Sequence, residues 1–122
     1  MRATSRQNAN HLISVEINRY RAARAATDHG EAWRALERAH IIAQPFLLPH
    51  LTSHWRMLGF AIAMCEGRET AGQLFRLALV PFGSLTGRLP TGNTGRARIS
   101  AFKPMPVPAD LAAAMSPGDK RQ

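Results

Sequence analysis

The stretch LERAHIIAQPFLLPHLTSHW, residues 36–55, holds two apolar runs separated by a turn that is bounded by prolines. Pro45 follows Gln44, and a residue before proline avoids helical backbone angles, so a helix formed by the first run should end there. Pro49 suits the first turn of a second helix, where its missing N–H costs nothing. The stretch therefore predicts a helical hairpin that bends at residues 45–49, and this hairpin sets the fold.

Hydrophobic periodicity extends the hairpin into four predicted helices, at residues 5–27, 30–44, 48–66 and 69–80. Apolar residues recur at helical three- and four-residue spacing in each of them. Asp28 and Glu31 have the spacing of a capping box between the first two helices, and Pro81 should end the fourth. The predicted fold is all-α, with about four helices in antiparallel hairpins.

Residues 81–108 have no helical pattern and are rich in glycine, proline and threonine. Only residues 97–102 have the composition of a short strand, and the sequence from Pro108 allows one or two last helical turns. The segment contains too many apolar anchors for a free tail: Phe82, Leu85, Leu89, Ile99, Phe102 and Met105. We therefore expect an extended, mostly irregular C-terminal arm that wraps over the helices or over a second subunit.

These segments predict one helical domain over residues 1–122, because 122 residues can bury a single core. The helical core should cover about residues 5–80. The ordered arm should cover about residues 81–112, and residues 113–122 should form a frayed tail.

The chain is strongly basic, with 16 Lys+Arg against 8 Asp+Glu and a formal net charge of +8. Such a charge attracts acidic molecules through a long-range field, so an acidic partner is one option. The arginines are spread from Arg2 to Arg121 without one dense block. The sequence therefore does not favour a nucleic-acid-binding function.

Three further features of the sequence indicate the cellular compartment of the protein. The N-terminal residues MRATSRQNAN are polar and lack the apolar run of a secretory signal. The longest apolar run, residues 57–65, is about half of the roughly 20 residues that a membrane span needs. Cys65 is the only cysteine, which rules out an intramolecular disulfide and fits a reducing compartment. We expect a cytoplasmic protein with no membrane contact.

Three of the five histidines, His40, His50 and His54, flank the bend, and Glu37 precedes the first of them by three residues. In an antiparallel hairpin the three histidines lie at a similar level. His50 and His54 are four residues apart, which stacks their Cβ atoms about 5–6 Å apart. Glu37 and His40 have the Glu-x-x-His spacing of carboxylate-bridged metal bundles. The sequence thus predicts a metal site with Glu37, His40, His50 and His54 as ligands.

Three nitrogens and one carboxylate suit zinc, or iron, manganese or copper. If one coordination position were open, a metal-activated water and Glu37 could perform chemistry, so the sequence leaves enzymatic activity undecided. The alternative is that the histidines are structural and the protein is a helical-hairpin module for interaction or dimerisation. An unsatisfied buried imidazole costs about 1–3 kcal/mol of folding free energy, so in either case the nitrogens of the three rings need a common partner.

Residues 87–92, GRLPTG, match the first half of a phosphate-binding loop. Asn93 and Thr94 follow where Lys and Ser/Thr are required, so this motif does not predict nucleotide binding. A nest of amides holding an anion, with Arg88, Arg96 and Arg98 nearby, is a weaker alternative than a plain glycine-rich turn.

The pattern LERAH-x3-Q-x5-H-x3-HW, followed by GQLFRL and then GNTGRARISAFKPMPVPADL, resembles a family of small bacterial proteins defined only as a domain of unknown function. The resemblance covers roughly residues 31–112 and implies no reaction. It does imply that the histidine cluster and the GNTG–FKPM arm belong to one design, so that the arm covers the site or mediates dimerisation. We expect a homodimer formed through the C-terminal arm.

Overall fold

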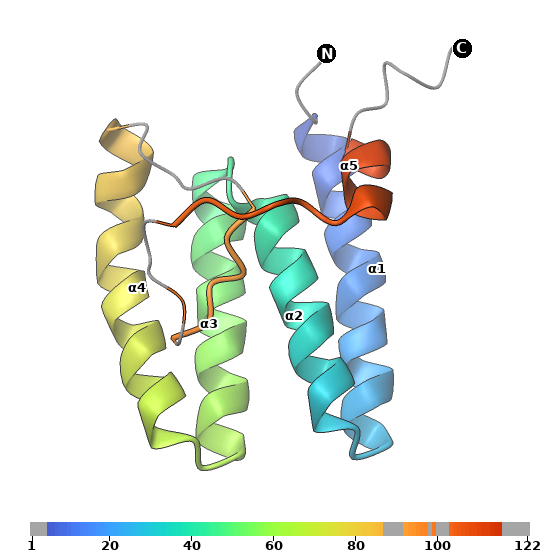
Figure 1. Cartoon of the computed structure of the whole chain (residues 1–122), viewed down its shortest axis with the longest axis vertical. Coiled ribbons are helices and arrows are strands. Elements are labelled where there is room, and N and C mark those ends of the chain that lie inside the picture. Colours follow the sequence, from blue (N-terminus) through green and yellow to red (C-terminus); the bar gives the residue numbers. More distant parts are fainter. Residues whose placement is uncertain (1–4, 87–91, 98, 100–102, 116–122) are drawn as a thin grey trace.

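The computed structural model describes residues 5–86, 92–97, 99 and 103–115, and all regular structure within them is helical. The helices are α1 (Arg6–Ala25), α2 (His29–Ala43), α3 (Leu47–Ala63), α4 (Gly67–Thr86) and α5 (Ala109–Met115). Helices α1 to α4 form a row in chain order, each antiparallel to the next (Figure 1). The predicted all-α fold of helical hairpins is confirmed.

The helix starts follow the local sequence. Ser5 caps α1, since its Oγ accepts a hydrogen bond from the backbone N–H of Asn8 at 3.1 Å. Asp28 caps α2 in the same way through the N–H of Glu31, at 3.2 Å. Helix α3 begins directly after Phe46, so Pro49 lies in its first turn, as the sequence predicts.

The prediction that Pro81 ends the fourth helix is wrong, because α4 continues through Pro81 to Thr86. Proline removes only one N–H, and the carbonyl of Leu77, four residues earlier, loses its donor. Pro81 is exposed, so water can hydrate that carbonyl. The arm therefore begins after Thr86 and not at residue 81.

Two apolar clusters hold the helices together. One joins α1, α2 and α3 around Phe60, against whose ring Tyr20 and Trp33 pack edge-on with centroids 5.4 and 5.0 Å away. The other joins α1, α2 and α5 around Ile42 and Leu111. None of the helices in the described part of the chain is long and apolar enough to cross a membrane.

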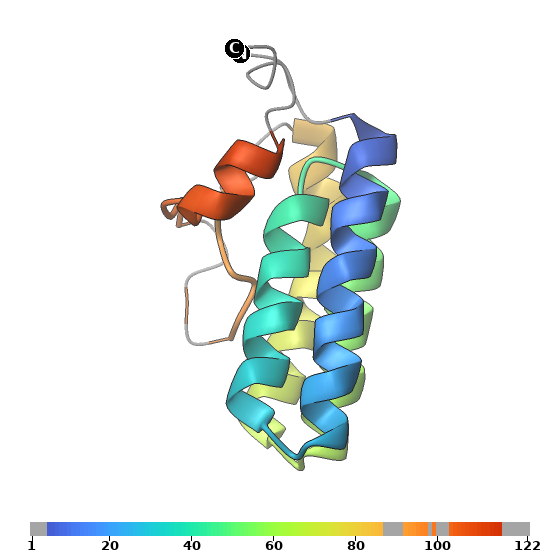
Figure 2. The ribbon, with the colours of Figure 1, turned by 90° about the vertical axis from the view of Figure 1, so that its right-hand side faces the viewer.

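The described part of the arm lies along one side of the helix row (Figure 2). It packs on its own chain: Val107 contacts the α1–α2 cluster, and α5 supplies the last helical turns that the sequence predicts. The strand predicted at 97–102 lies largely outside the described residues, as does the GRLPT part of the phosphate-loop motif.

Candidate metal centre

The α2–α3 bend brings the Nε2 atoms of three histidines together. His40 of α2 lies 3.1 Å from His50 and 3.1 Å from His54, and the two α3 histidines are 3.2 Å apart. Their exposed fractions are 2%, 3% and 2%. The predicted convergence of the three rings is confirmed, and we call these residues the histidine triad.

The spacing of the triad fits a metal ion. An ion about 2.0–2.1 Å from each of three nitrogens needs them roughly 2.9 Å apart in octahedral geometry and roughly 3.4 Å apart in tetrahedral geometry. The observed separations of 3.1–3.2 Å fall between these limits.

The protonation of His40 is fixed by its surroundings. Its Nδ1 lies 2.8 Å from the backbone carbonyl oxygen of Asn93. A carbonyl oxygen only accepts hydrogen bonds, so Nδ1 must carry the proton and donate it. In the neutral ring, Nε2 then presents a bare lone pair to the centre of the triad.

His54 is fixed in the same way through Gln73 of α4. Its Nδ1 lies 2.7 Å from the Gln73 Oε1 atom. The orientation of that amide is settled, because its Nε2 donates to a Glu69 carboxylate oxygen at 2.7 Å and to the Gly95 carbonyl at 2.8 Å. His54 must therefore donate from Nδ1 and also direct an Nε2 lone pair at the centre.

With these two tautomers, neither His40 nor His54 places a proton between the Nε2 atoms at the centre of the triad. The 3.1 Å contact between His40 and His54 brings two lone pairs together without a proton. His50 can supply one proton at most while it is neutral, and its buried Nδ1 has no hydrogen-bond partner among the described residues. A cation between the three nitrogens would remove this conflict.

A proton is poorly suited to be that cation. Burial, together with the neighbouring His54, lowers the pKa of His50 to about 3. Burial also lowers the pKa of His54 to about 4, although its hydrogen bond to Gln73 acts in the opposite direction. The pKa of His40 is held well below its ordinary value by burial and by the other two rings. The triad is therefore neutral at physiological pH and free to bind a metal.

We expect acid to destabilise the metal-free protein. Unfolded histidines have pKa values near 6.5, whereas His50 and His54 titrate at about 3 and about 4 in the folded chain, so the unfolded state binds more protons between these values. The free energy of unfolding should fall as the pH drops below about 6.5, by roughly 1–2 kcal/mol per triad histidine at pH 5. Urea unfolding at pH 7 and pH 5 measures this. Equal stability at the two pH values would contradict a neutral triad.

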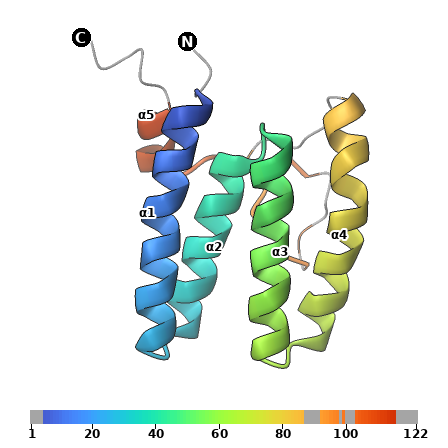
Figure 3. The ribbon, with the colours of Figure 1, turned by 180° about the vertical axis from the view of Figure 1, so that it is seen from behind.

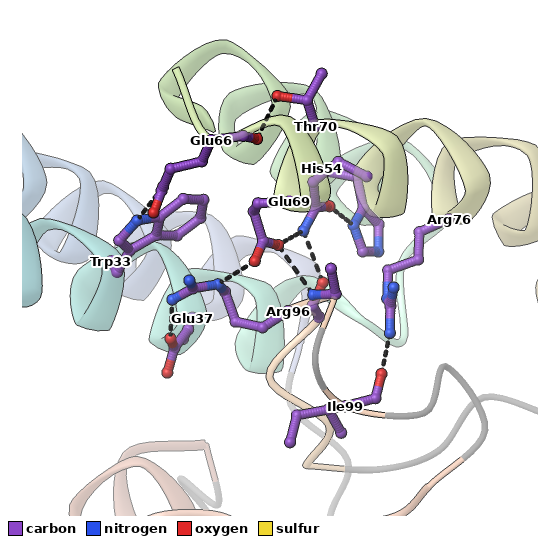
Figure 4. Close-up of polar contacts among 12 residues, drawn as sticks. Trp33, Glu37, His54, Glu66, Glu69, Thr70, Arg76, Arg96 and Ile99 are labelled. Atoms are coloured by element: carbon purple, nitrogen blue, oxygen red, sulfur yellow. Dashed lines mark hydrogen bonds and ion pairs between the residues drawn. The ribbon is translucent and has the colours of Figure 1, made fainter. Parts of the chain in front are cut away.

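A network around Arg96 ties the arm to the helices beside the triad (Figure 4). Its guanidinium donates to Glu37 of α2 and to Glu69 of α4, both at 2.9 Å. The same group lies over the ring of Trp33, 3.8 Å from the centroid. Arg96 is therefore occupied by helix residues and is not available to the anion nest considered above.

Glu37, the fourth predicted ligand, is not brought into the triad. Its carboxylate pairs with Arg96, and the group of potential ligand atoms within 4.8 Å of one another contains only the three histidines, among the described residues. Cys65 is exposed at the other end of α3. The clustered ligand set thus consists of imidazole nitrogens alone.

Glu69 connects the arm to the triad as a buried anion. Burial alone would raise its pKa, but hydrogen bonds from Arg96, from Gln73 and from the backbone N–H of Ala97 outweigh this effect and lower it. The Gln73 amide links this negative charge to His54, and the charge of Glu69 raises the pKa of that ring.

Gly95 lies directly against the triad. A Cβ atom at this position would be 2.8 Å from Cδ2 and 2.9 Å from Nε2 of His40, and the backbone has φ +84°, which favours glycine. The Gly95 N–H also donates to the Asn93 side-chain oxygen at 2.8 Å, which holds the turn that supplies the His40 acceptor. Residues 92–97 of the arm therefore cover the triad.

Helix spacing does not reveal the residues that orient the triad, namely Gln73, Asn93 and Gly95. Each is distant in sequence from its histidine, so helix geometry could not pair them. The only signal was the resemblance, because Gln73 stands in its GQLFRL motif and Asn93 and Gly95 stand in GNTG. Its implication that the arm covers the site agrees with the geometry.

Comparison with known proteins gives a family match that describes no activity. The model of the family described as "Protein of unknown function (DUF3703)" matches residues 7–115. None of the curated proteins and none of the solved structures matches the chain.

Proposed function

The chain belongs to the DUF3703 family, whose function is unknown, so we infer its role from its own site: we propose that it binds one transition-metal ion through the Nε2 atoms of His40, His50 and His54. The observation that carries the proposal is the 3.1 Å approach of the His40 and His54 lone pairs, whose tautomers are fixed by Asn93 and Gln73. Such an approach is favourable only around a cation.

The surroundings of the triad favour binding of an ion over reaction with a large substrate. The triad rings are nearly fully buried, and the arm covers them at Gly95. Three protein ligands would leave one coordination position for water or another small ligand, and the burial of the rings keeps large molecules away from it. We therefore propose a role in metal retention or handling.

The ligand chemistry narrows the choice of ion. Three neutral imidazoles suit zinc, copper, iron or nickel, whereas manganese prefers oxygen ligands. The Asn93 backbone carbonyl and the Gln73 Oε1 atom accept hydrogen bonds from the two rings that they contact, in the manner of the groups that orient histidine ligands in metal proteins. Zinc is the simplest candidate, because it needs no redox partner and accepts geometries between tetrahedral and octahedral.

Metal analysis of the untagged protein tests the proposal. After equilibration with excess zinc or cobalt and desalting, one equivalent should remain bound, and a chelator should lower the melting temperature. If no metal is retained and the chelator leaves the melting temperature unchanged, the histidines are structural and the helical-hairpin module is the better reading.

Glu37→Gln separates the two possible ligand sets. Because Glu37 pairs with Arg96 and lies outside the triad, this variant should still retain one equivalent of metal, with affinity changed by less than about tenfold. Competition titration with a chromogenic chelator measures the change. A loss of more than about 100-fold would show that the carboxylate is a ligand after all.

A further inference from the structure

Helix α3 carries a line of exposed apolar side chains on the side away from the triad. Leu48, Trp55 and Ile62 are 61%, 66% and 58% exposed. They are seven residues apart, which is about two helical turns, so they lie along one edge of the helix. We call these three residues the α3 stripe.

All three stripe side chains are more than half exposed against the described part of the chain. Seen from behind, α3 is unobstructed, and the arm passes on the far side of the row (Figure 3). An apolar patch of a few hundred Å² is about the largest that a typical soluble monomer exposes, and such patches are often functional.

The area of the stripe matches one side of a dimer interface. The exposed parts of the stripe and of the neighbouring Leu47, 43% exposed, sum to roughly 450 Å². A standard interface covers about 800 Å² on each partner, of which somewhat more than half is apolar. The stripe can therefore supply the apolar part of such an interface.

The spacing and charge favour a second copy of this chain as the occupant. The stripe is symmetric about Trp55, so a two-fold axis at this residue would place Leu48 of one copy against Ile62 of the other. Residues 47–63 contain one arginine and no lysine or acidic residue. That arginine, Arg56, lines a groove of about 440 Å³ beside α1, together with Arg21 and the stripe residue Leu48. The three stripe side chains themselves carry no charge, so two copies of a basic chain can bring their stripes together.

We propose that the α3 stripe is a homodimer interface, in which two copies pair α3 antiparallel about a two-fold axis at Trp55. The interface is separate from the triad and does not depend on metal binding. It also differs from dimerisation through the arm, which packs on its own chain where the structure describes it.

Sedimentation equilibrium of the untagged full chain tests the interface. The wild-type protein should have about twice the mass of the 13.4 kDa chain at about 100 µM. Ile62→Glu should halve that mass with an unchanged helical circular dichroism spectrum, because it buries a charge against Leu48.

The matched control is Phe75→Glu. Phe75 is 57% exposed and points away from α3, because it follows Gln73, which contacts α3, by two residues. This variant should stay dimeric. A monomeric wild type, a dimeric Ile62→Glu variant or a monomeric Phe75→Glu variant would overturn the proposal.

The native cysteine reports the orientation of the pair. In the antiparallel arrangement the two Cys65 residues are roughly 30 Å apart, since each lies ten residues from the axis. A short bismaleimide should not couple them, but it should couple two copies of a Thr52→Cys variant made in a Cys65→Ser background. Coupling through Cys65 without coupling at position 52 would rule out the antiparallel pairing.

Discussion

His50→Ala should abolish metal retention while leaving the protein folded, with affinity reduced by more than about 100-fold, since even partners outside the ligand set typically contribute 10–100-fold. His50 is the best of the triad to remove. Its Nδ1 has no hydrogen-bond partner among the described residues, and its Nε2 contacts only the other two triad rings, so its loss unpairs no described group outside the triad. Replacing His54 would instead leave the Gln73 oxygen without its donor. Zinc titration with thermal melts measures the effect, because only a chain that binds metal gains stability as zinc rises.

The matched control for this variant is His11→Ala. His11 is an exposed histidine of α1 whose side chain has no part in the triad. This control should retain one equivalent of zinc and the full zinc-dependent rise in melting temperature. If His50→Ala and His11→Ala respond alike to zinc, the binding site is elsewhere or the binding is non-specific.

Gly95→Ala should have the second large effect, because it acts on the arm and the triad together. The new methyl group would lie within 3 Å of the His40 ring, and alanine at φ +84° costs about 1–2 kcal/mol in backbone strain alone. We expect the free energy of unfolding to fall by at least about 2 kcal/mol, and metal affinity to fall as His40 is displaced. Urea unfolding and zinc competition measure the two quantities.

Gly67→Ala provides the control for a glycine-to-alanine change. A Cβ atom at Gly67, the first residue of α4, meets nothing within 4 Å, and its backbone is not in the left-handed region. Its stability should stay within about 1 kcal/mol of wild type, with metal affinity unchanged. Equal behaviour of the two variants would show that close packing of the arm on His40 is not required.

The fold was largely predictable because its signals are local. Pro45 and Pro49 bracket the bend, Asp28 caps the second helix, and apolar periodicity marks each helix. The prediction that Pro81 ends the fourth helix is wrong because α4 tolerates one missing N–H at an exposed position.

The candidate site was predictable only in part. His50 and His54 share one helix face, and His40 lies just across the bend, so helix geometry alone places the triad. The partner of Glu37 was not predictable, because Arg96 arrives from 59 residues away along an arm without periodicity. Long-range contacts made by irregular segments leave no pattern that a single sequence displays.

X-ray absorption at the zinc edge, on untagged protein loaded with one equivalent of zinc, tests the central claim most directly. The proposed site predicts three imidazole nitrogens at about 2.0–2.1 Å, with any remaining ligand a light atom. His50→Ala should retain no zinc after desalting and should therefore give no zinc-edge signal. A first shell that contains sulfur, or one made of oxygen without imidazole, would contradict binding by the histidine triad.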